Sequence, residues 1–350
     1  METASAIRDY GKGNVITYSP KVFIPLTKLC RDTCGYCTFR KDPEYEVPYM
    51  SPEEVLSLAI TGDQMGCTEA LFTLGERPEQ KYDVAKQWLS KYGYRSTIEY
   101  LVEMNRLVFE KSNLFPHSNP GTLSRRELKM LKPYNASMGL MLESISPKLY
   151  RENGPHENAP SKRPAVRIKT ISLAGEEQIA FTTGLLIGIG DSFKEQVDGI
   201  HEIKKINDEY GHVQEVIIQN FRPKLNTPLN SLPSPKEKYM LRLVSIARII
   251  LGPNMNLQVP PNITVGDFGE FINAGINDWG GVSPVTIDHV NPEAPWPQLK
   301  KLKSVTEKYG YQLKPRLPIY SEYLDRMENF VSRAMDDKIR NRPIIEIKHK

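Results

Sequence analysis

The sequence contains the segment Leu29-Cys30-Arg31-Asp32-Thr33-Cys34-Gly35-Tyr36-Cys37-Thr38-Phe39, directly after the apolar run 22–25. The apolar run predicts a short buried strand, and the C-x3-C-x2-C spacing places three thiols on the loop that follows it. Three thiolates can hold three irons of a cubane cluster and leave the fourth iron open to a small molecule. A structural zinc normally takes four protein ligands, and no CxxC pair or His-x3-5-His completes such a set nearby.

Cysteine is otherwise rare in the chain. Only four cysteines occur among 350 residues, and the fourth, Cys67, stands alone. In a reducing compartment such grouping argues for metal binding rather than for disulfides. Cys67 follows a predicted helix and leads into the next predicted strand. We interpret it as a small buried residue, with a role as a fourth cluster ligand as the less favoured alternative.

Composition and charge are typical of an ordinary folded enzyme. Hydrophobic residues make up 39% and charged residues 25% of the chain, which argues against disorder. The formal net charge of +4 is small, and the lysines and arginines are interleaved with acids, so no nucleic-acid partner is expected. No apolar run has the length of a signal peptide or a membrane span, so we expect a cytoplasmic protein without a membrane partner.

Apolar runs alternate with amphipathic stretches along most of the chain. The predicted strands lie at residues 22–25, 70–74, 113–115, 136–142, 181–187, 213–220, 256–259 and 276–279. Helical patterns lie between them, for example at residues 52–64, 97–111, 193–208, 236–250 and 298–309. About eight strand–helix units predict an α/β fold, a TIM-type (β/α)8 barrel in a single domain.

The predicted domain boundaries follow from the same pattern. We expect an N-terminal segment at residues 1–17, the barrel at residues 18–310 and a C-terminal helical extension at residues 311–350. The first dozen residues and the tail 340–350 are predicted to be loose. The segment 223–235 is rich in Pro, Asn and Ser and predicts a long loop over the active-site mouth.

The cysteine spacing, with Tyr36 as the aromatic residue before the last cysteine, resembles the radical S-adenosylmethionine (SAM) superfamily. The resemblance implies a 4Fe-4S cluster on Cys30, Cys34 and Cys37, whose open iron is chelated by the methionine end of SAM. It also implies one-electron cleavage of SAM to methionine and a 5′-deoxyadenosyl radical. The barrel would hold that radical against a substrate hydrogen and away from water.

The ends of two predicted strands carry glycines that the same resemblance assigns to SAM binding. Gly75 and Glu76 stand in the turn after the second strand, where the superfamily binds the methionine amino group; Leu74 replaces a glycine that is common there. Gly188, at the end of the fifth strand, would support the adenine through backbone contacts. The structural alternatives are an ordinary turn and a strand-packing glycine.

Two charged residues near the fourth strand are further candidates for SAM contacts. Glu143 ends that strand, and Arg167 lies on the following helix. A carboxylate can accept hydrogen bonds from both ribose hydroxyls, and a guanidinium can donate two parallel hydrogen bonds to the methionine carboxylate. Each of these residues could instead be half of a barrel salt bridge.

Polar side chains recur where predicted strands end, which is where such barrels place chemistry. They include His117 after the third strand and Gln219 and Asn220 at the sixth, together with Asp278 and Asp288 at the eighth. These five are the candidate catalytic residues, and together they predict a polar pocket for a large, hydrogen-bonding substrate. A lone histidine is more often structural, so no single one is assigned as a general base.

Six segments, read in order, narrow the resemblance. They are 75–79, 116–121, 139–143, 181–184, 215–221 and the tryptophan–glycine segment Asp278-Trp279-Gly280-Gly281-Val282-Ser283-Pro284-Val285-Thr286. These segments are similar to the CofG family, the first subunit of FO synthase (7,8-didemethyl-8-hydroxy-5-deazariboflavin synthase). The resemblance runs from about residue 18 to residue 309. Ser118, where threonine is common, and Asp191, where glutamate is common, are small departures.

The CofG resemblance implies the ring-closing step of deazaflavin coenzyme biosynthesis. The substrate would be a uracil–hydroxybenzyl adduct, 5-amino-5-(4-hydroxybenzyl)-6-(D-ribitylimino)-5,6-dihydrouracil. Its supplier would be the second FO synthase subunit, CofH, which makes it from tyrosine. Hydrogen abstraction would allow the ring to close with release of ammonia, in an ammonia-lyase and cyclase reaction that gives FO. A low-potential electron donor such as ferredoxin or flavodoxin is the other expected partner.

Three alternatives stay open on the sequence alone. The first is a sister radical SAM enzyme, such as the tyrosine-lysing subunit or a menaquinone-pathway homologue. The second is a structural zinc or thiol-redox site in a barrel of unrelated function. The third is an RNA-modifying radical enzyme, which is disfavoured because the charges form no concentrated arm.

Overall fold

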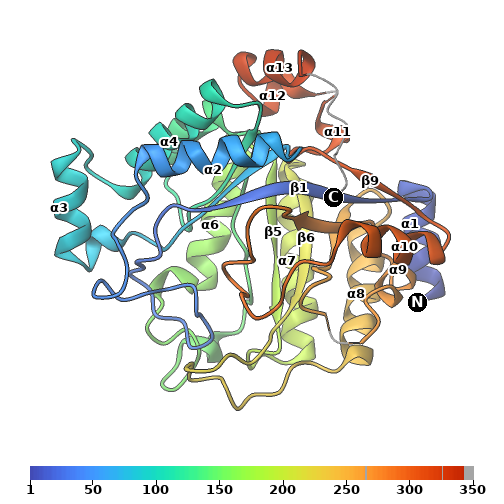
Figure 1. Ribbon diagram of the computed structural model, residues 1–350. Coiled ribbons are helices and arrows are strands. Elements are labelled where there is room, and N and C mark those ends of the chain that lie inside the picture. The colour runs from blue at the N-terminus through green and yellow to red at the C-terminus, as the bar shows by residue number, and fades with distance from the viewer. Residues whose placement is uncertain (265, 325, 343–350) are drawn as a thin grey trace.

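Parallel strands close into a barrel in the computed structural model, which describes residues 1–264, 266–324 and 326–342 (Figure 1). The strands follow one another around the barrel in chain order, and β1 pairs with both β2 and β8 to close it. The strands are β1 (Val15–Pro25), β2 (Glu69–Thr73), β3 (Phe115–Asn119), β4 (Ser137–Gly139), β5 (Phe181–Ile187), β6 (Val213–Asn220), β7 (Asn256–Gln258), β8 (Asp278–Val282) and β9 (Gln312–Pro315). The predicted TIM-type (β/α)8 fold is confirmed.

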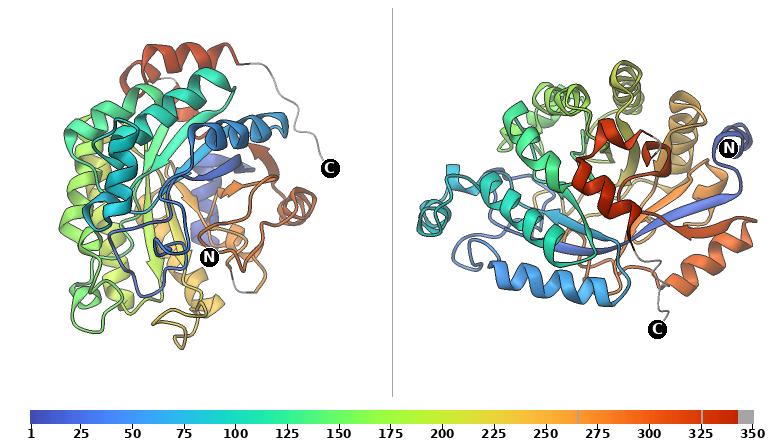
Figure 2. Two further views of the ribbon diagram at one scale, coloured as in Figure 1. Left: turned by 60° about the vertical axis from the view of Figure 1, so that its left-hand side comes forward. Right: turned by 90° about the horizontal axis from the view of Figure 1, so that it is seen from above.

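Helices surround the strands, as the view along the barrel in Figure 2 shows. They are α1 (Glu2–Lys12), α2 (Pro52–Gln64), α3 (Asp83–Lys91), α4 (Thr97–Lys111), α5 (Arg125–Leu131), α6 (Pro164–Glu176), α7 (Phe193–Tyr210), α8 (Glu237–Leu251), α9 (Glu270–Asn273), α10 (Leu299–Lys308), α11 (Ser321–Leu324), α12 (Met327–Phe330) and α13 (Arg333–Arg340). Short 3-10 turns lie at Pro78–Gln80, Lys132–Tyr134, Pro147–Tyr150 and Pro160–Lys162. None of the helices in the described part of the chain is long and apolar enough to cross a membrane.

The strongest sequence patterns gave the most accurate boundaries. The strands predicted at 181–187 and 213–220 and the helices predicted at 52–64 and 97–111 are confirmed to the residue. Every residue of β5 is buried, as expected for a parallel strand that is covered on both faces. Ser51 begins α2 with a full capping box to Glu54, which fixes the start of that helix.

The third strand differs from its prediction. It runs from Phe115 to Asn119, so His117 and Ser118 lie within the strand and not after it. Both side chains are buried, and that of His117 contacts Ser137 on β4. The barrel interior is polar at this level, so the change from apolar to polar residues does not mark the end of the strand.

The N-terminal residues were predicted to be loose, and this prediction is wrong. Residues 2–12 form helix α1, which packs against α8. The Arg8 side chain is fully buried and donates to the carbonyls of Ile272 and Ile276 at 2.9 and 2.6 Å. Its guanidinium also lies over the ring of Tyr311, 4.3 Å from the centroid. One buried arginine thus anchors a helix whose own sequence is weakly apolar.

The C-terminal extension closes the end of the barrel at which the strands begin. It starts with a strand, β9, which pairs with the first residues of β1, and helices follow only after that. Apolar residues of this extension pack on Phe115, Ala136 and Ala180, which lie at or just before the starts of β3, β4 and β5. Figure 2 shows the C-terminal helices lying across this end. Of the tail predicted to be loose, Arg340 ends α13, and residues 343–350 lie outside the described residues.

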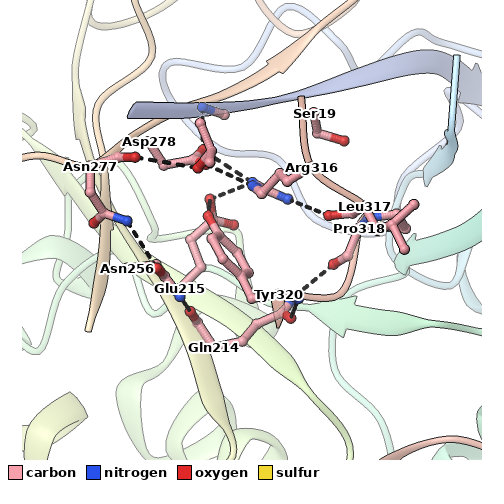
Figure 3. Close-up of polar contacts among 12 residues, drawn as sticks. Ser19, Gln214, Glu215, Asn256, Asn277, Asp278, Arg316, Leu317, Pro318 and Tyr320 are labelled. Atoms are coloured by element: carbon pink, nitrogen blue, oxygen red, sulfur yellow. Dashed lines mark hydrogen bonds and ion pairs between the residues drawn. The ribbon is translucent and has the colours of Figure 1, made fainter. Parts of the chain in front are cut away.

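A buried ion network fills the same end of the barrel (Figure 3). Arg316 donates to Asp278 at 2.7 and 3.1 Å and to Glu215 at 2.9 Å, and its guanidinium stacks on Tyr320. The Tyr320 hydroxyl donates to Glu215 at 2.8 Å, and Thr182 donates to the other Glu215 oxygen at 3.1 Å. One cation therefore faces two carboxylates without bulk water.

This charge imbalance predicts a pH-dependent stability. Burial, together with the charge of Asp278, raises the pKa of Glu215 from 4.5 to about 7, against the opposing effect of Arg316. Between these two pH values the folded protein keeps a proton that the unfolded chain has released, so Glu215 lowers stability as pH rises through this window. Glu215→Gln keeps the shape without the ionisation. We expect its stability relative to the parent protein to rise between pH 5 and pH 8 by on the order of 2 kcal/mol, measured by urea unfolding. A difference that does not change with pH would contradict this assignment.

Candidate active site

An open cavity of about 360 Å³ lies at the end of the barrel where the strands finish. Its wall is formed by late residues of the strands, such as Phe23, Leu71 and Leu186, and by the loops that follow them. The long loops at the lower edge of Figure 1 surround this end, opposite the C-terminal helices. Chemistry in parallel barrels is located at this end.

The three clustered cysteines line this cavity. Cys30, Cys34 and Cys37 are partly exposed free thiols, while Cys67 is buried in the main core, as predicted, and is not part of the cavity wall. Burial raises the pKa of the Cys30 thiol to about 11 and that of Cys34 further. Over the described ranges, no three His, Cys, Asp or Glu side chains are drawn together as they are around a bound metal ion. The three thiols line the same cavity, but their sulfur atoms are not grouped around one point.

The turn after β2 lies directly against the cysteine loop. The Glu76 N–H donates to the Cys30 sulfur at 3.1 Å, and the Gly75 N–H donates to the Thr27 carbonyl at 2.9 Å. A side chain at Gly75 would not fit, because its Cβ would lie 2.0 Å from the Leu29 carbonyl oxygen and 2.8 Å from the Cys30 Cβ. Because Gly75 has no side chain, the backbone of the turn after β2 can pack directly against the backbone of the cysteine loop.

We expect Gly75→Ala to push the cysteine loop away from the β2 turn. The clash is with backbone atoms, which cannot rotate away, and overpacking of this kind costs about 1–3 kcal/mol. Anaerobic reconstitution should therefore load less iron than in the parent protein. Gly211→Ala is a suitable control, because Gly211 has φ +64 with nothing within 4 Å of the added Cβ. It should cost about 1 kcal/mol of backbone strain and leave iron loading unchanged. Equal iron loading in both variants would refute the role given to Gly75.

Glu76 holds the next loop in place. Its carboxylate accepts from the Thr122 N–H at 3.0 Å and from the Thr122 hydroxyl at 2.7 Å, and Arg77 lies 3.4 Å away. Gly121, at φ +88, makes room for it, since a Cβ there would lie 1.9 Å from a Glu76 oxygen. The side chain of Glu76 is thus used within the protein, and both Glu76 and Gly75 border the cavity.

A buried charge cluster occupies the wall that follows β4. Glu143, at φ +65, accepts hydrogen bonds from Tyr36 and Lys162 and lies 3.3 Å from His156 and 3.7 Å from Arg167. Burial alone would raise the pKa of Glu143, but the cations Lys162 and Arg167 hold it well below its usual range. Burial raises the pKa of Tyr36 well above its usual value, so its hydroxyl stays a donor. Because two cations, Lys162 and Arg167, face the single carboxylate of Glu143, this wall of the cavity carries a net positive charge.

The polar wall of the cavity is formed by residues on β6 and in the loop after β8. Gln219, Asn220 and Asp288, three of the five candidate catalytic residues, line the cavity. Both Asp288 oxygens already accept hydrogen bonds: one from the backbone N–H groups of residues 290 and 291, the other from Asn262 and Asn291, all at 3.0 Å. Asn220 donates to the Ile263 carbonyl at 2.6 Å, and its amide oxygen is buried without a partner in the described structure.

Three predicted site residues do not line the cavity. His117 lies one layer below it, between Ser137 at 2.6 Å and Asn119 at 3.2 Å, and burial lowers its pKa. The position predicted for Asp278 is wrong: it opens β8 at the far end of the barrel and pairs with Arg316 (Figure 3). The strand is shifted by a few residues because Trp279 and the glycines after it belong to it. Gly188, at φ +100, packs against Pro235 of the long loop.

The loop predicted at 223–235 is confirmed as a long segment without helix or strand. It lies against the cysteine loop, where the Leu229 N–H donates to the Gly35 carbonyl at 3.0 Å. Leu229 and Leu232 pack with Tyr36 in one small apolar cluster. Lys162 and His156 carry no sequence signal of their role, because they lie between β4 and α6 outside any periodic pattern or motif.

Comparison with known proteins places the chain in a family. A model of the radical SAM superfamily matches residues 24–203. A 7,8-didemethyl-8-hydroxy-5-deazariboflavin synthase from Methanopyrus kandleri is 50% identical over 331 residues, which are 93% of this chain and 99% of that protein. The chain belongs to the radical SAM superfamily and, within it, to the deazariboflavin synthase family. Membership in the superfamily implies a 4Fe-4S cluster and SAM, and it removes the zinc-site alternative.

Other relatives of the deazariboflavin synthase family agree. The protein of the same name from Methanocaldococcus jannaschii is 44% identical over 97% of this chain and 92% of its own length. An FO synthase from Streptomyces avermitilis is 44% identical over 93% of this chain, but the match covers only 39% of that longer protein. The members of this family thus include proteins of this length and much longer ones.

Solved structures support the fold. The hydrogenase maturase HydG superimposes with a TM-score of 0.72 at 17% identity, covering 96% of this chain and 71% of that chain. Methylornithine synthase (PylB) superimposes with a TM-score of 0.67 at 18% identity, covering 89% and 87% of the two chains. At such low identity the likeness concerns the fold alone.

Proposed function

We propose that this protein closes the deazaflavin ring system, converting the uracil–hydroxybenzyl adduct into FO with release of ammonia. The observation that carries this proposal is the 50% identity to a deazariboflavin synthase over nearly the full length of both chains. The cavity supports it, because three thiols and a positive wall face a polar wall across one space. The protein is thus a radical SAM enzyme of FO biosynthesis, and the adduct is its proposed substrate.

The residues present fit the cluster that the family implies. Three thiols line one cavity, and no fourth cysteine of the described chain does, which suits a cluster with one open iron. A backbone N–H already donates to the Cys30 sulfur, a contact that typically tunes iron–sulfur clusters. We propose that Cys30, Cys34 and Cys37 hold the 4Fe-4S cluster. When bound together there, the cluster and SAM would supply a 5′-deoxyadenosyl radical as the hydrogen-atom acceptor, with the reduced cluster as the source of the single electron that cleaves SAM.

The positive wall suits the methionine end of SAM. Arg167, which donates to the Ser161 carbonyl at 3.1 Å and also to the Met141 carbonyl, is held rigidly beside Glu143. We propose that Arg167 and Lys162 face the methionine carboxylate and that Glu143 accepts hydroxyls of the ribose. Tyr36 positions Glu143, and the backbone at Gly75 and Glu76 receives the methionine amino group. Gly188 serves the adenine only indirectly, by seating the long loop.

The polar wall suits the adduct. Gln219 and Asn220 offer amide groups to a molecule rich in carbonyl, N–H and hydroxyl groups, and Asp288 holds Asn262 beside them. The expected partners are a supplier of the adduct, the second FO synthase subunit CofH, and a low-potential donor such as ferredoxin or flavodoxin. The longer FO synthase relatives are consistent with a supplier that is fused in some organisms.

The test is an anaerobic assay of the reconstituted full chain with SAM, dithionite and the adduct. We expect a fluorescent deazaflavin, with 5′-deoxyadenosine and ammonia formed alongside it. A parallel assay with tyrosine and the ribitylamino-uracil should give none of these products, which separates this enzyme from a tyrosine-lysing one. Consumption of tyrosine, or no deazaflavin from the adduct, would overturn the proposal.

A further inference from the structure

The two glycines of the tryptophan–glycine segment make room for long polar side chains from neighbouring strands. A Cβ at Gly281 would lie 2.2 Å from the Cε and 2.4 Å from the Nζ of Lys21 on β1. A Cβ at Gly280, where φ is +73, would lie 1.9 Å from the amide of Gln258 on β7. Both Lys21 and Gln258 line the cavity. The glycines on β8 thus allow these two side chains to reach the cavity, on the side of the barrel opposite β4 and Glu143.

Lys21 is a buried cation that lines the cavity, and its Nζ has no hydrogen-bond or ion-pair partner in the described structure. The residue is 9% exposed, and its Nζ lies 4.9 Å from the ring centroid of Trp296 and 5.8 Å from that of Phe23. No ion pair or hydrogen bond joins it to the residues that the structure describes. Burial lowers its pKa, so its proton is held less tightly than that of a surface lysine.

The ionisable groups around Lys21 each make hydrogen bonds to other residues. Glu69 on β2 accepts from Ser19, Glu215 on β6 accepts from Arg316, and Asp288 accepts from two asparagines. His117 on β3 is buried between Ser137 and Asn119. None of these groups makes a hydrogen bond or ion pair with the Lys21 ammonium in the described structure.

Other ionisable side chains of the cavity wall are also engaged. Lys162 pairs with Glu143, Lys224 donates to the Val290 carbonyl, and Arg40 pairs with Asp42 at 2.6 Å. Lys21 therefore stands out as a group that can both give and take a proton at a ligand in the cavity.

We propose that Lys21 is the acid–base residue of the ammonia-releasing step, an inference that rests on the proposed function. The Lys21 ammonium gives a proton to the amino group on C5 of the adduct. The C5–N bond then breaks, and its electron pair leaves with ammonia. The neutral lysine takes back one proton that the adduct loses as its rings become conjugated. One proton leaves Lys21 and one returns, so this elimination needs no oxidant beyond the SAM radical chemistry.

The first test is Lys21→Met, which keeps the length of the side chain and removes the acid. We expect 5′-deoxyadenosine to form from SAM and adduct at near the parental rate, because Lys21 is not among the residues that hydrogen-bond Cys30 or pair with Glu143 in the described structure. Deazaflavin and ammonia should fall together by at least about 100-fold, the usual contribution of a general acid–base group.

A second pair of variants separates proton transfer from charge and packing. Lys21→Arg keeps the cation but holds its proton too tightly to transfer it, so deazaflavin formation should stay low. Lys21→Ala leaves space for a small amine, and added alkylamines should restore deazaflavin formation to a degree that depends on their pKa. The pH–rate profile of the parent enzyme should lose its acid-group limb in Lys21→Met.

Lys28→Met is the matched control, because Lys28 pairs with Glu46 at 3.1 Å and lies outside the cavity wall. It should behave like the parent protein. Parental deazaflavin formation in Lys21→Met or Lys21→Arg would overturn the proposal, as would a parallel loss of 5′-deoxyadenosine and deazaflavin in folded, iron-loaded Lys21→Met. Failure of the parent enzyme itself to convert the adduct would instead overturn the proposed function, and this assignment with it.

Discussion

Cys34→Ala is expected to give a folded barrel that makes neither 5′-deoxyadenosine nor deazaflavin. Cys34 lies on a loop that is fixed at both sides, by the Gly35 N–H to the Pro155 carbonyl at 2.8 Å and by the Leu229 N–H to the Gly35 carbonyl. The loop should keep its shape when one thiol is removed, and two thiols cannot hold three irons of a cubane. The activity loss should therefore be complete. Activity is measured as 5′-deoxyadenosine formed per protein chain after anaerobic iron reconstitution. Circular dichroism checks that the variant is folded.

Cys67→Ala provides the control for removal of a thiol. Cys67 is 1% exposed within the main core and does not line the cavity. This variant should bind iron and form deazaflavin like the parent, with a stability loss of about 1 kcal/mol for the lost packing. Full iron content and activity in Cys34→Ala, or their loss in Cys67→Ala, would show that the ligand set has been assigned wrongly.

Arg316→Met is expected to destabilise the fold by about 3–5 kcal/mol, because it leaves Asp278 and Glu215 buried without their cation. Both carboxylates are at most 6% exposed at the side chain. Removal of one partner from a buried pair is costly because the remaining charge has no water to solvate it. The shift is measured from urea unfolding monitored by circular dichroism, at a pH near 8 where both carboxylates are ionised when unfolded.

Arg106→Met is the matched control, since Arg106 also faces two carboxylates, Glu103 and Glu110, but on the surface of α4. Its removal should change stability little, because water solvates the acids that remain. Combining Arg316→Met with Glu215→Gln should recover part of the loss. An equal loss of unfolding free energy in Arg316→Met and Arg106→Met would mean that water reaches Asp278 and Glu215 and that this network is not buried.

Much of the fold could be predicted because its signals are local. The apolar runs of β5 and β6 and the amphipathic pattern of α4 depend on neighbours within one element, and the cysteine loop is a contiguous motif. Strand ends were harder to place where the barrel interior is polar. His117 and Asp278 are inside strands, although their polarity is typical of loops.

The parts of the site that carry no sequence motif depend on contacts between distant segments. Lys162 meets Glu143 and His156 meets Tyr36 only because loops after β4 fold back over the cysteine loop. Arg8 is buried only because residues 272–276 and Tyr311 surround it. One signal was present in the sequence: Lys21 is a charged residue next to the apolar run 22–25, which is unusual unless the position faces a polar cavity.

The Arg316 network also has a consequence for the passage of molecules. The network and the C-terminal extension fill the end of the barrel where the strands begin, so the barrel is closed at that end. We expect substrates to enter, and the products of the proposed reaction to leave, through the loop-lined mouth of the cavity. A bound product of the proposed reaction would therefore block the next substrate molecule, so each turnover requires the cavity to fill and to empty completely.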